Sequence, residues 1–237
     1  MALTDCVTYP LVLAAEDIVP IVLAGVGYWY LSKRVLNDFD GSPAVALAMR
    51  IAAVLLVVCS FLAGPVRKIL ANVAAVPICA PDFEVPYSQF QIPFVSALAP
   101  GFAILTWGVI CTLKGRKVAF WPAIVLLALG VVGAVADVFA VGERTILFAV
   151  GGLWATALAV STGILAARQR DFVATGLFAL YALGTLALPP ISSKGNVSDV
   201  NVQWLAQGIN TATQGLFLYA CYRLFTRYQR QSTTTAV

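Results

Sequence analysis

Long apolar runs alternate with short polar or charged segments along the whole chain. Seven of these runs approach or exceed the roughly 20 residues that a helix needs to cross the hydrocarbon core of a bilayer. We predict spans over residues 11–31, 43–62, 92–113, 118–141, 146–167, 172–188 and 202–225. The pattern predicts an all-α polytopic membrane protein, with seven transmembrane helices in a single domain over residues 1–237.

The end of the second span has a clear sequence signal. Ala63, Gly64 and Pro65 follow the apolar run, and a Gly-Pro pair is typical of a helix end. The next residues, including Arg67 and Lys68, have the pattern of an amphipathic turn at the membrane surface. We therefore expect both cations in a connection outside the bilayer core, and no lysine inside any span.

Composition and charge placement add an orientation. The chain is 60% apolar and 11% charged, well outside the range of soluble domains. Ten basic residues lie after the first, third and fifth spans and at the C-terminal end, against four on the opposite side. The positive-inside rule then predicts an outside N-terminus and a cytoplasmic C-terminus, in a plasma or inner membrane. The basic residues behind the net charge of +4 lie in short clusters between the apolar runs, so nucleic acid is not expected as a partner.

Histidine is absent from the chain. This argues against haem or zinc held by histidine, and against Ser-His or Cys-His nucleophilic chemistry. The cofactor stays unknown, and an enzyme is the less favoured class.

The five cysteines form no CxxC pair, but Cys6 and Cys79 both fall on the predicted outer side. They form a disulfide if their backbones approach closely enough, and otherwise remain free thiols.

A row of amide side chains marks the seventh span. Gln203, Gln207, Asn210 and Gln214 step by four, three and four residues, so they share an arc of roughly 60° on a helix. Such a row faces away from lipid. It has two readings: hydrogen bonds that fix the packing of this helix, or the lining of a wet pocket or pathway.

Three carboxylates share the depth of this row. Glu16 and Asp17 enter the first span from outside, and Asp137 lies near the outer end of the fourth span. Glu16 and Asp17 are adjacent, so they point about 100° apart and are not expected to face one cavity. Arg50 lies roughly 10 Å deep from the cytoplasmic side. It either extends back to the headgroups, or forms an internal ion pair or anion contact that closes the inner side of a pathway.

Seven spans, an outside N-terminus and this length resemble a microbial rhodopsin in outline. That family implies a Schiff-base lysine in the seventh span, which has none here, so we expect no bound retinal. Ceramidase-like hydrolases of the same topology need metal-ligating histidine. The Pro-Gln signatures of small sugar transporters are not found either.

The sequence thus favours an outward-facing polar cavity inside the membrane that binds or transports a small polar solute or cation. Two alternatives stay open: a receptor-like or non-catalytic subunit of a membrane complex, and a lipid-modifying enzyme without histidine. The expected partners are the lipid bilayer, a small solute or ion, and a second copy or other membrane subunits. The candidate lining residues are Asp137, Gln207, Asn210, Gln214, Gln203, Glu16, Asp17 and Arg50.

Overall fold

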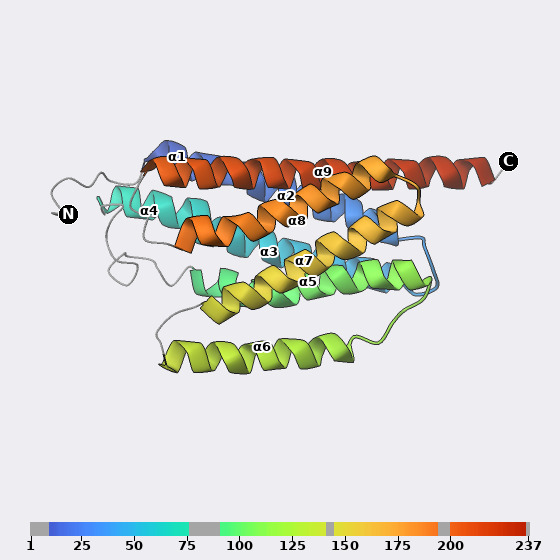
Figure 1. Cartoon of the computed structure of the whole chain (residues 1–237), viewed down its shortest axis with the longest axis horizontal. Helices are drawn as coiled ribbons and strands as arrows, with labels where there is room; N and C mark the ends of the chain where they lie inside the picture. Colours follow the sequence, from blue (N-terminus) through green and yellow to red (C-terminus); the bar gives the residue numbers. More distant parts are fainter. Residues whose placement is uncertain (1–9, 76–90, 141–144, 194–199, 236–237) are drawn as a thin grey trace.

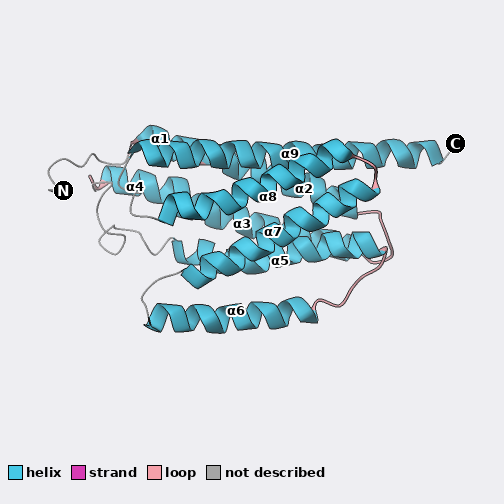
Figure 2. Ribbon diagram, viewed as in Figure 1, coloured by secondary structure: helices cyan, strands magenta, loops and turns pink. Residues whose placement is uncertain are grey.

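The computed structural model describes residues 10–75, 91–140, 145–193 and 200–235. Within these ranges the chain forms helices joined by short loops and no strand (Figure 2). The helices are α1 (Leu11–Glu16), α2 (Ile18–Val35), α3 (Ser42–Phe61), the π-helical η2 (Leu62–Val66), α4 (Arg67–Val73), α5 (Gln91–Lys114), α6 (Trp121–Ala140), α7 (Thr145–Arg168), α8 (Phe172–Ser193) and α9 (Val200–Thr235).

Several of these helices join end to end into longer rods. The first rod is α1 and α2, with Asp17 at the junction, and the second is α3, η2 and α4. Together with α5 to α9 they make seven helical rods in the described part of the chain. The prediction of an all-helical chain with seven helices is confirmed. The last helix is longer than the predicted seventh span, because it continues to Thr235.

Four stretches of the described chain are long and apolar enough to cross a membrane: Leu11–Val35, Ser42–Val73, Ser96–Lys114 and Ala149–Arg168. Shorter apolar stretches occur in α6 (Trp121–Gly133) and α8 (Phe172–Leu188). The described part of α9 is not among them, since its amides and its polar end lower its hydropathy. Four such helices are consistent with a membrane protein.

The second rod corrects one prediction. The helix does not end at Ala63-Gly64-Pro65 but passes through the π turn of η2 and continues as α4 to Val73. Proline lacks an N–H donor and crowds the preceding turn. A wider π turn relieves this crowding, so the helix continues instead of breaking. Lys68 consequently lies on a helix within a stretch that is long and apolar enough to cross a membrane, and not in the connecting turn that we expected.

Six rods pack side by side in a closed ring. The seventh, α6, lies outside it (Figure 1). In order around the ring, the neighbours are α2, α3, α5, α7, α8 and α9, and α9 packs again on α2. The outlying α6 rests mainly on α7 and more lightly on α5. Neighbours in sequence are thus mostly neighbours in space, as short connections between antiparallel helices require.

The middle of the ring is filled by aromatic side chains. Phe217 of α9 lies at their centre, with its ring centroid 5.4 Å from Tyr28, 4.7 Å from Tyr181 and 6.2 Å from Phe178. Tyr28 also meets Phe102 edge-on at 6.3 Å. All five side chains are buried. These contacts fill the centre of the bundle with packed rings.

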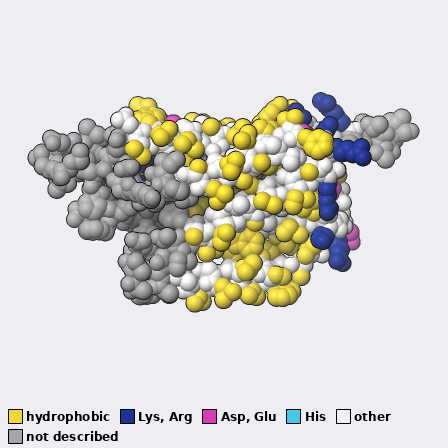
Figure 3. Space-filling view, viewed as in Figure 1, with side chains coloured by type: hydrophobic (Ala, Val, Ile, Leu, Met, Phe, Trp, Pro, Cys, Tyr) yellow, Lys and Arg dark blue, Asp and Glu magenta, His cyan; other side chains and the backbone are white. Residues whose placement is uncertain are grey.

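The outer surface has two characters. Large apolar side chains are exposed along the helices, and Lys and Arg gather at one end of the molecule (Figure 3). Large exposed apolar surface is unfavourable in water and suits a lipid environment.

Candidate functional site

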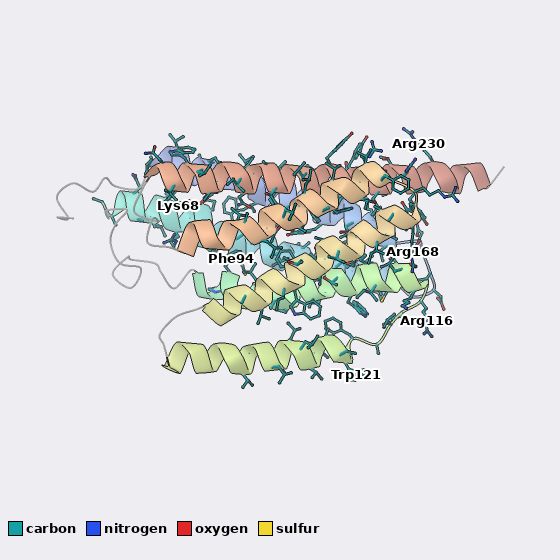
Figure 4. All side chains as sticks on the ribbon, viewed as in Figure 1. Lys68, Phe94, Arg116, Trp121, Arg168 and Arg230 are labelled. Carbon is teal, nitrogen blue, oxygen red and sulfur yellow. The ribbon has the colours of Figure 1, made fainter. Side chains whose placement is uncertain are left out.

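A cluster of polar side chains is buried at the end of the bundle opposite the basic residues. Figure 4 shows Lys68 at that end, with Arg116, Arg168 and Arg230 at the other. The cluster draws on three rods: the α1–α2 junction, the η2–α4 segment, and α9. Its members lie between five and eleven residues from the nearest end of their rod, roughly 8–17 Å along the helix axis.

The centre of the cluster is an ion pair between Asp17 and Lys68. The Lys68 ammonium lies 2.7 Å from Oδ2 of Asp17, and each side chain is 8% exposed. The amide nitrogen of Gln207 donates a hydrogen bond to the other carboxylate oxygen, Oδ1. A Cβ at Gly64 would lie 3.1 Å from Oδ2, so the glycine allows the second rod to approach this carboxylate. A buried ion pair with further hydrogen bonds fits an apolar bundle, because neither charge is left alone.

Arg67 is a second buried cation beside this pair. Its Nε donates to the carbonyl oxygen of Ala63 at 3.1 Å, within the π turn. The turn that carries the helix past Pro65 therefore brings both cations of α4 into the bundle.

The second carboxylate, Glu16, contacts the same face of α9. The hydroxyl of Thr211 donates to Oε1 of Glu16, one helical turn beyond Gln207. The other oxygen, Oε2, is buried and has no hydrogen-bond partner among the described residues. Glu16 and Asp17 thus both reach α9, contrary to our expectation. Adjacent side chains diverge around a helix, but α9 runs alongside the α1–α2 junction and receives one carboxylate at each of two successive turns.

The remaining amides continue along α9 toward the aromatic centre. The amide nitrogen of Gln214 lies 3.5 Å from Oδ1 of Asn210, a long hydrogen bond within the helix. Oε1 of Gln214 is buried with no partner in the described part of the chain. Gln203 is half-buried near the start of α9. Of the four amides, Gln207 contacts the carboxylates directly.

Two predictions fall on residues whose side chains are not described. Asp137 is in α6, but its side chain lies outside the described residues, as do Cys6 and Cys79 of the predicted disulfide. Within the described part of the chain the cysteines are free thiols, buried at Cys59, Cys111 and Cys221. Nor does that part contain a group of three or more His, Cys, Asp or Glu side chains that could hold a metal.

Arg50 is separate from the cluster. Its Nε donates to the hydroxyl of Ser32 at 3.3 Å, and its guanidinium lies 4.7 Å from the centre of the Trp29 ring. The structure therefore brings together Glu16, Asp17 and Gln207, and leaves Arg50 on the α2–α3 side of the bundle.

At the basic end of the molecule, the carboxylate of Asp171 lies between α7 and α8 and contacts groups of α8 and α9. Oδ1 accepts from the Ala174 N–H at 3.1 Å, which caps α8, and from Arg223 of α9 at 3.1 Å. Arg227 lies 3.8 Å from Oδ2. Burial raises the pKa of the Asp171 carboxyl, but the cap hydrogen bond and the two guanidinium groups outweigh it, so the pKa is below its ordinary value.

Lys68, Arg67 and Thr211 complete the cluster, and the sequence did not identify them. The Gly-Pro pair placed the two cations in a loop. A single threonine in an apolar helix is usually bonded to its own backbone. The available signal was the helical pattern of residues 66–73, which continues after the proline.

The cluster has two chemical capacities. Its carboxylate oxygens can accept hydrogen bonds from an ammonium or hydroxyl group or coordinate a cation, and its buried acid–base pair can exchange a proton. The chain matches no protein-family model, no curated protein and no solved structure. An assignment of function therefore depends on the geometry of this cluster.

Proposed function

We propose that this chain is a seven-span membrane protein that binds a small polar solute or cation at the buried cluster of Glu16, Asp17, Lys68, Gln207 and Thr211. The unpaired carboxylate oxygen of Glu16 carries the proposal. It is buried beside a second carboxylate, with no hydrogen-bond partner in the described part of the chain. A buried acceptor without a partner costs about 1–3 kcal/mol or more when charged, and a bound cation or hydrogen-bond donor would remove that cost.

The placement of basic residues supports a site that opens to the outside. With Arg67 and Lys68 assigned to a helix, the outer side keeps two of its four basic residues, against ten on the other side. This sharpens the asymmetry that orients membrane proteins. The packed rings around Phe217 separate the cluster from the basic end. An outside solute could then reach the cluster without an open path to the cytoplasm, as alternating access requires.

The experiment is a ligand screen on the purified full-length protein. Thermal unfolding would be followed in detergent with Na⁺, K⁺, ammonium, and a panel of neutral polyols and zwitterionic amino acids. We expect at least one probe to raise the midpoint in a saturable manner. Glu16→Gln and Gln207→Leu should abolish the shift.

The matched control is Thr185→Val. The Thr185 hydroxyl donates to the carbonyl of Tyr181 in its own helix, at 2.9 Å, whereas Thr211→Val removes the donor to Glu16. The first variant should keep the ligand response and the second should weaken it. Absence of a shift with every probe, or an undiminished shift in Gln207→Leu, would refute the proposal.

A second candidate function is that of a non-catalytic or receptor-like subunit, and α6 favours it. This helix lies outside the ring, and its large apolar side chains from Ile124 to Val132 are mostly 48–68% exposed. Extraction in mild detergent followed by native mass spectrometry distinguishes this candidate. A subunit would retain a partner chain in fixed ratio, and a solute-binding protein acting alone would not.

A further inference from the structure

A groove runs along the outside of the bundle between α2 and α3, away from the polar cluster. Its volume is about 190 Å³. Its walls are small or branched apolar side chains, one tryptophan and one cation. The lining residues are Gly25, Trp29, Arg50, Ala53, Val54, Val57 and Val58.

The groove has a charged end and an apolar end. Arg50 and Val58 are eight positions apart on α3, which is about 12 Å along the axis. Helical side chains tilt toward the N-terminus of their helix, and α3 begins at Ser42, at the basic end of the molecule. Arg50 accordingly extends toward that end, where it meets Ser32. The apolar part of the groove runs the other way, toward Gly25 and Val58.

Two cations flank one indole at the charged end. Arg50 lies 4.7 Å and the Lys33 ammonium 5.1 Å from the centre of the Trp29 ring. Among the described residues, neither cation has a carboxylate partner; Arg50 bonds only to the neutral hydroxyl of Ser32. A tryptophan beside Lys and Arg is typical of the level of lipid headgroups.

We propose that this groove binds an anionic phospholipid. One acyl chain lies along Gly25, Val57 and Val58, and the phosphate is held by Arg50 and Lys33. The two unneutralised positive charges specify a headgroup with net negative charge. The site is independent of the polar cluster at the opposite end.

The test measures lipid retention on the full-length protein. The purified protein would be incubated with equal amounts of phosphatidylglycerol and phosphatidylcholine of the same chain length, and bound lipid counted by native mass spectrometry. We expect phosphatidylglycerol to be preferred. Arg50→Gln should reduce that preference by about fivefold, the effect of one basic residue at a membrane surface, and Lys33→Gln should reduce it further.

Two matched controls separate this site from general effects. Arg116→Gln removes a charge from the same end of the molecule but away from the groove, and should leave the preference unchanged. Val54→Trp fills the groove from a side chain that is 63% exposed, whereas Val132→Trp adds the same bulk at a 68% exposed site on α6. Only Val54→Trp should lower binding of both lipids.

Three results would overturn the proposal: no preference for the anionic lipid in the wild type, the same loss in Arg116→Gln as in Arg50→Gln, or unchanged retention in a Val54→Trp protein that elutes as a single folded species. Arg50→Lys keeps the charge, and it should retain most of the preference if the headgroup is recognised by charge.

Discussion

Asp17 and Lys68 show why single residues matter in this bundle. Each is buried among apolar helices, and each neutralises the other at 2.7 Å. Removing one leaves a buried charge, whereas removing both leaves a neutral site. The carboxylate also has Gln207 as a donor, so the ammonium depends more heavily on its partner.

A double-mutant cycle tests this dependence. Lys68→Met should lower the free energy of unfolding by about 3 kcal/mol, because Asp17 is then buried without its counter-charge. Asp17→Asn should cost at least as much, because the ammonium depends more heavily on this partner, and the double variant should recover most of the loss. The measurement is reversible unfolding in detergent micelles. Lys114→Met, at the exposed end of α5, is the control and should change little. Additive losses in the double variant would show that the pair does not interact.

At this scale the sequence identified the acceptors and missed the cations. Glu16, Asp17 and Gln207 were recognisable because polar groups in apolar runs are rare. Their partners could not be paired from sequence, since contacts between residues 17, 68 and 207 depend on how three distant helices pack. Lys68 was misplaced because a local rule for proline was applied where a π turn had absorbed the proline.

Close packing between whole helices depends on glycines at the crossing points. A Cβ at Gly184 of α8 would lie 2.2 Å from the hydroxyl oxygen of Thr213 on α9. Threonine is branched at Cβ and has few alternative rotamers, so it cannot move aside easily. At Gly176, on the same helix, nothing lies within 4 Å of the added atom.

These two glycines give a matched prediction. Gly184→Ala should destabilise the protein by about 1–3 kcal/mol, because α8 and α9 must separate. Gly176→Ala should be neutral or stabilise it by about 0.5–1 kcal/mol through helix propensity. Thermal unfolding of the two variants side by side provides the comparison. Equal effects would mean that α8 and α9 do not cross closely at Gly184.

The cap of α8 makes stability depend on pH. Asp171 has a lowered pKa in the folded protein, so the unfolded chain binds more protons as the pH falls past about 4. Its contribution is fully present above that value and is lost as the pH falls through the folded-state pKa. Asp171→Asn should cost about 2 kcal/mol at pH 7, and this cost should shrink as the pH falls below about 4 and through the folded-state pKa. Chemical unfolding measured across this range checks the convergence. The exposed Asp40→Asn is the control, and parallel curves for Asp171→Asn and the wild type would contradict the assignment.

The molecule as a whole is polar inside at one end and basic outside at the other, with apolar helices between. Its all-helical class and its seven rods followed from the sequence, because hydrophobic run length is a strong signal. The ring order of the helices and the outlying position of α6 did not, since lipid-facing and protein-facing apolar residues have similar compositions. The continuity of the second rod was likewise hidden by the Gly-Pro pair.

Cysteine labelling tests the orientation proposed for this arrangement. In a background with Cys6→Ser and Cys79→Ser, a membrane-impermeant maleimide should label Ala75→Cys in intact cells. Arg116→Cys, at the opposite end, should react only after the membrane is opened. Both positions are exposed, so accessibility within the protein does not confound the comparison. The reverse pattern would place the N-terminus in the cytoplasm.

The uninterrupted length of α9 has a mechanical consequence. From Val200 to Thr235 the helix contains no proline and no break. It meets Asp17 through Gln207 near one end and Asp171 through Arg223 near the other. These contacts are sixteen positions apart, about 24 Å along a single stiff element. A tilt of α9 that loosens the carboxylates on one side of the bundle must also displace the guanidinium groups on the other. Movement of α9 at the polar cluster would therefore be transmitted to the contacts of Asp171 at the basic end of the molecule.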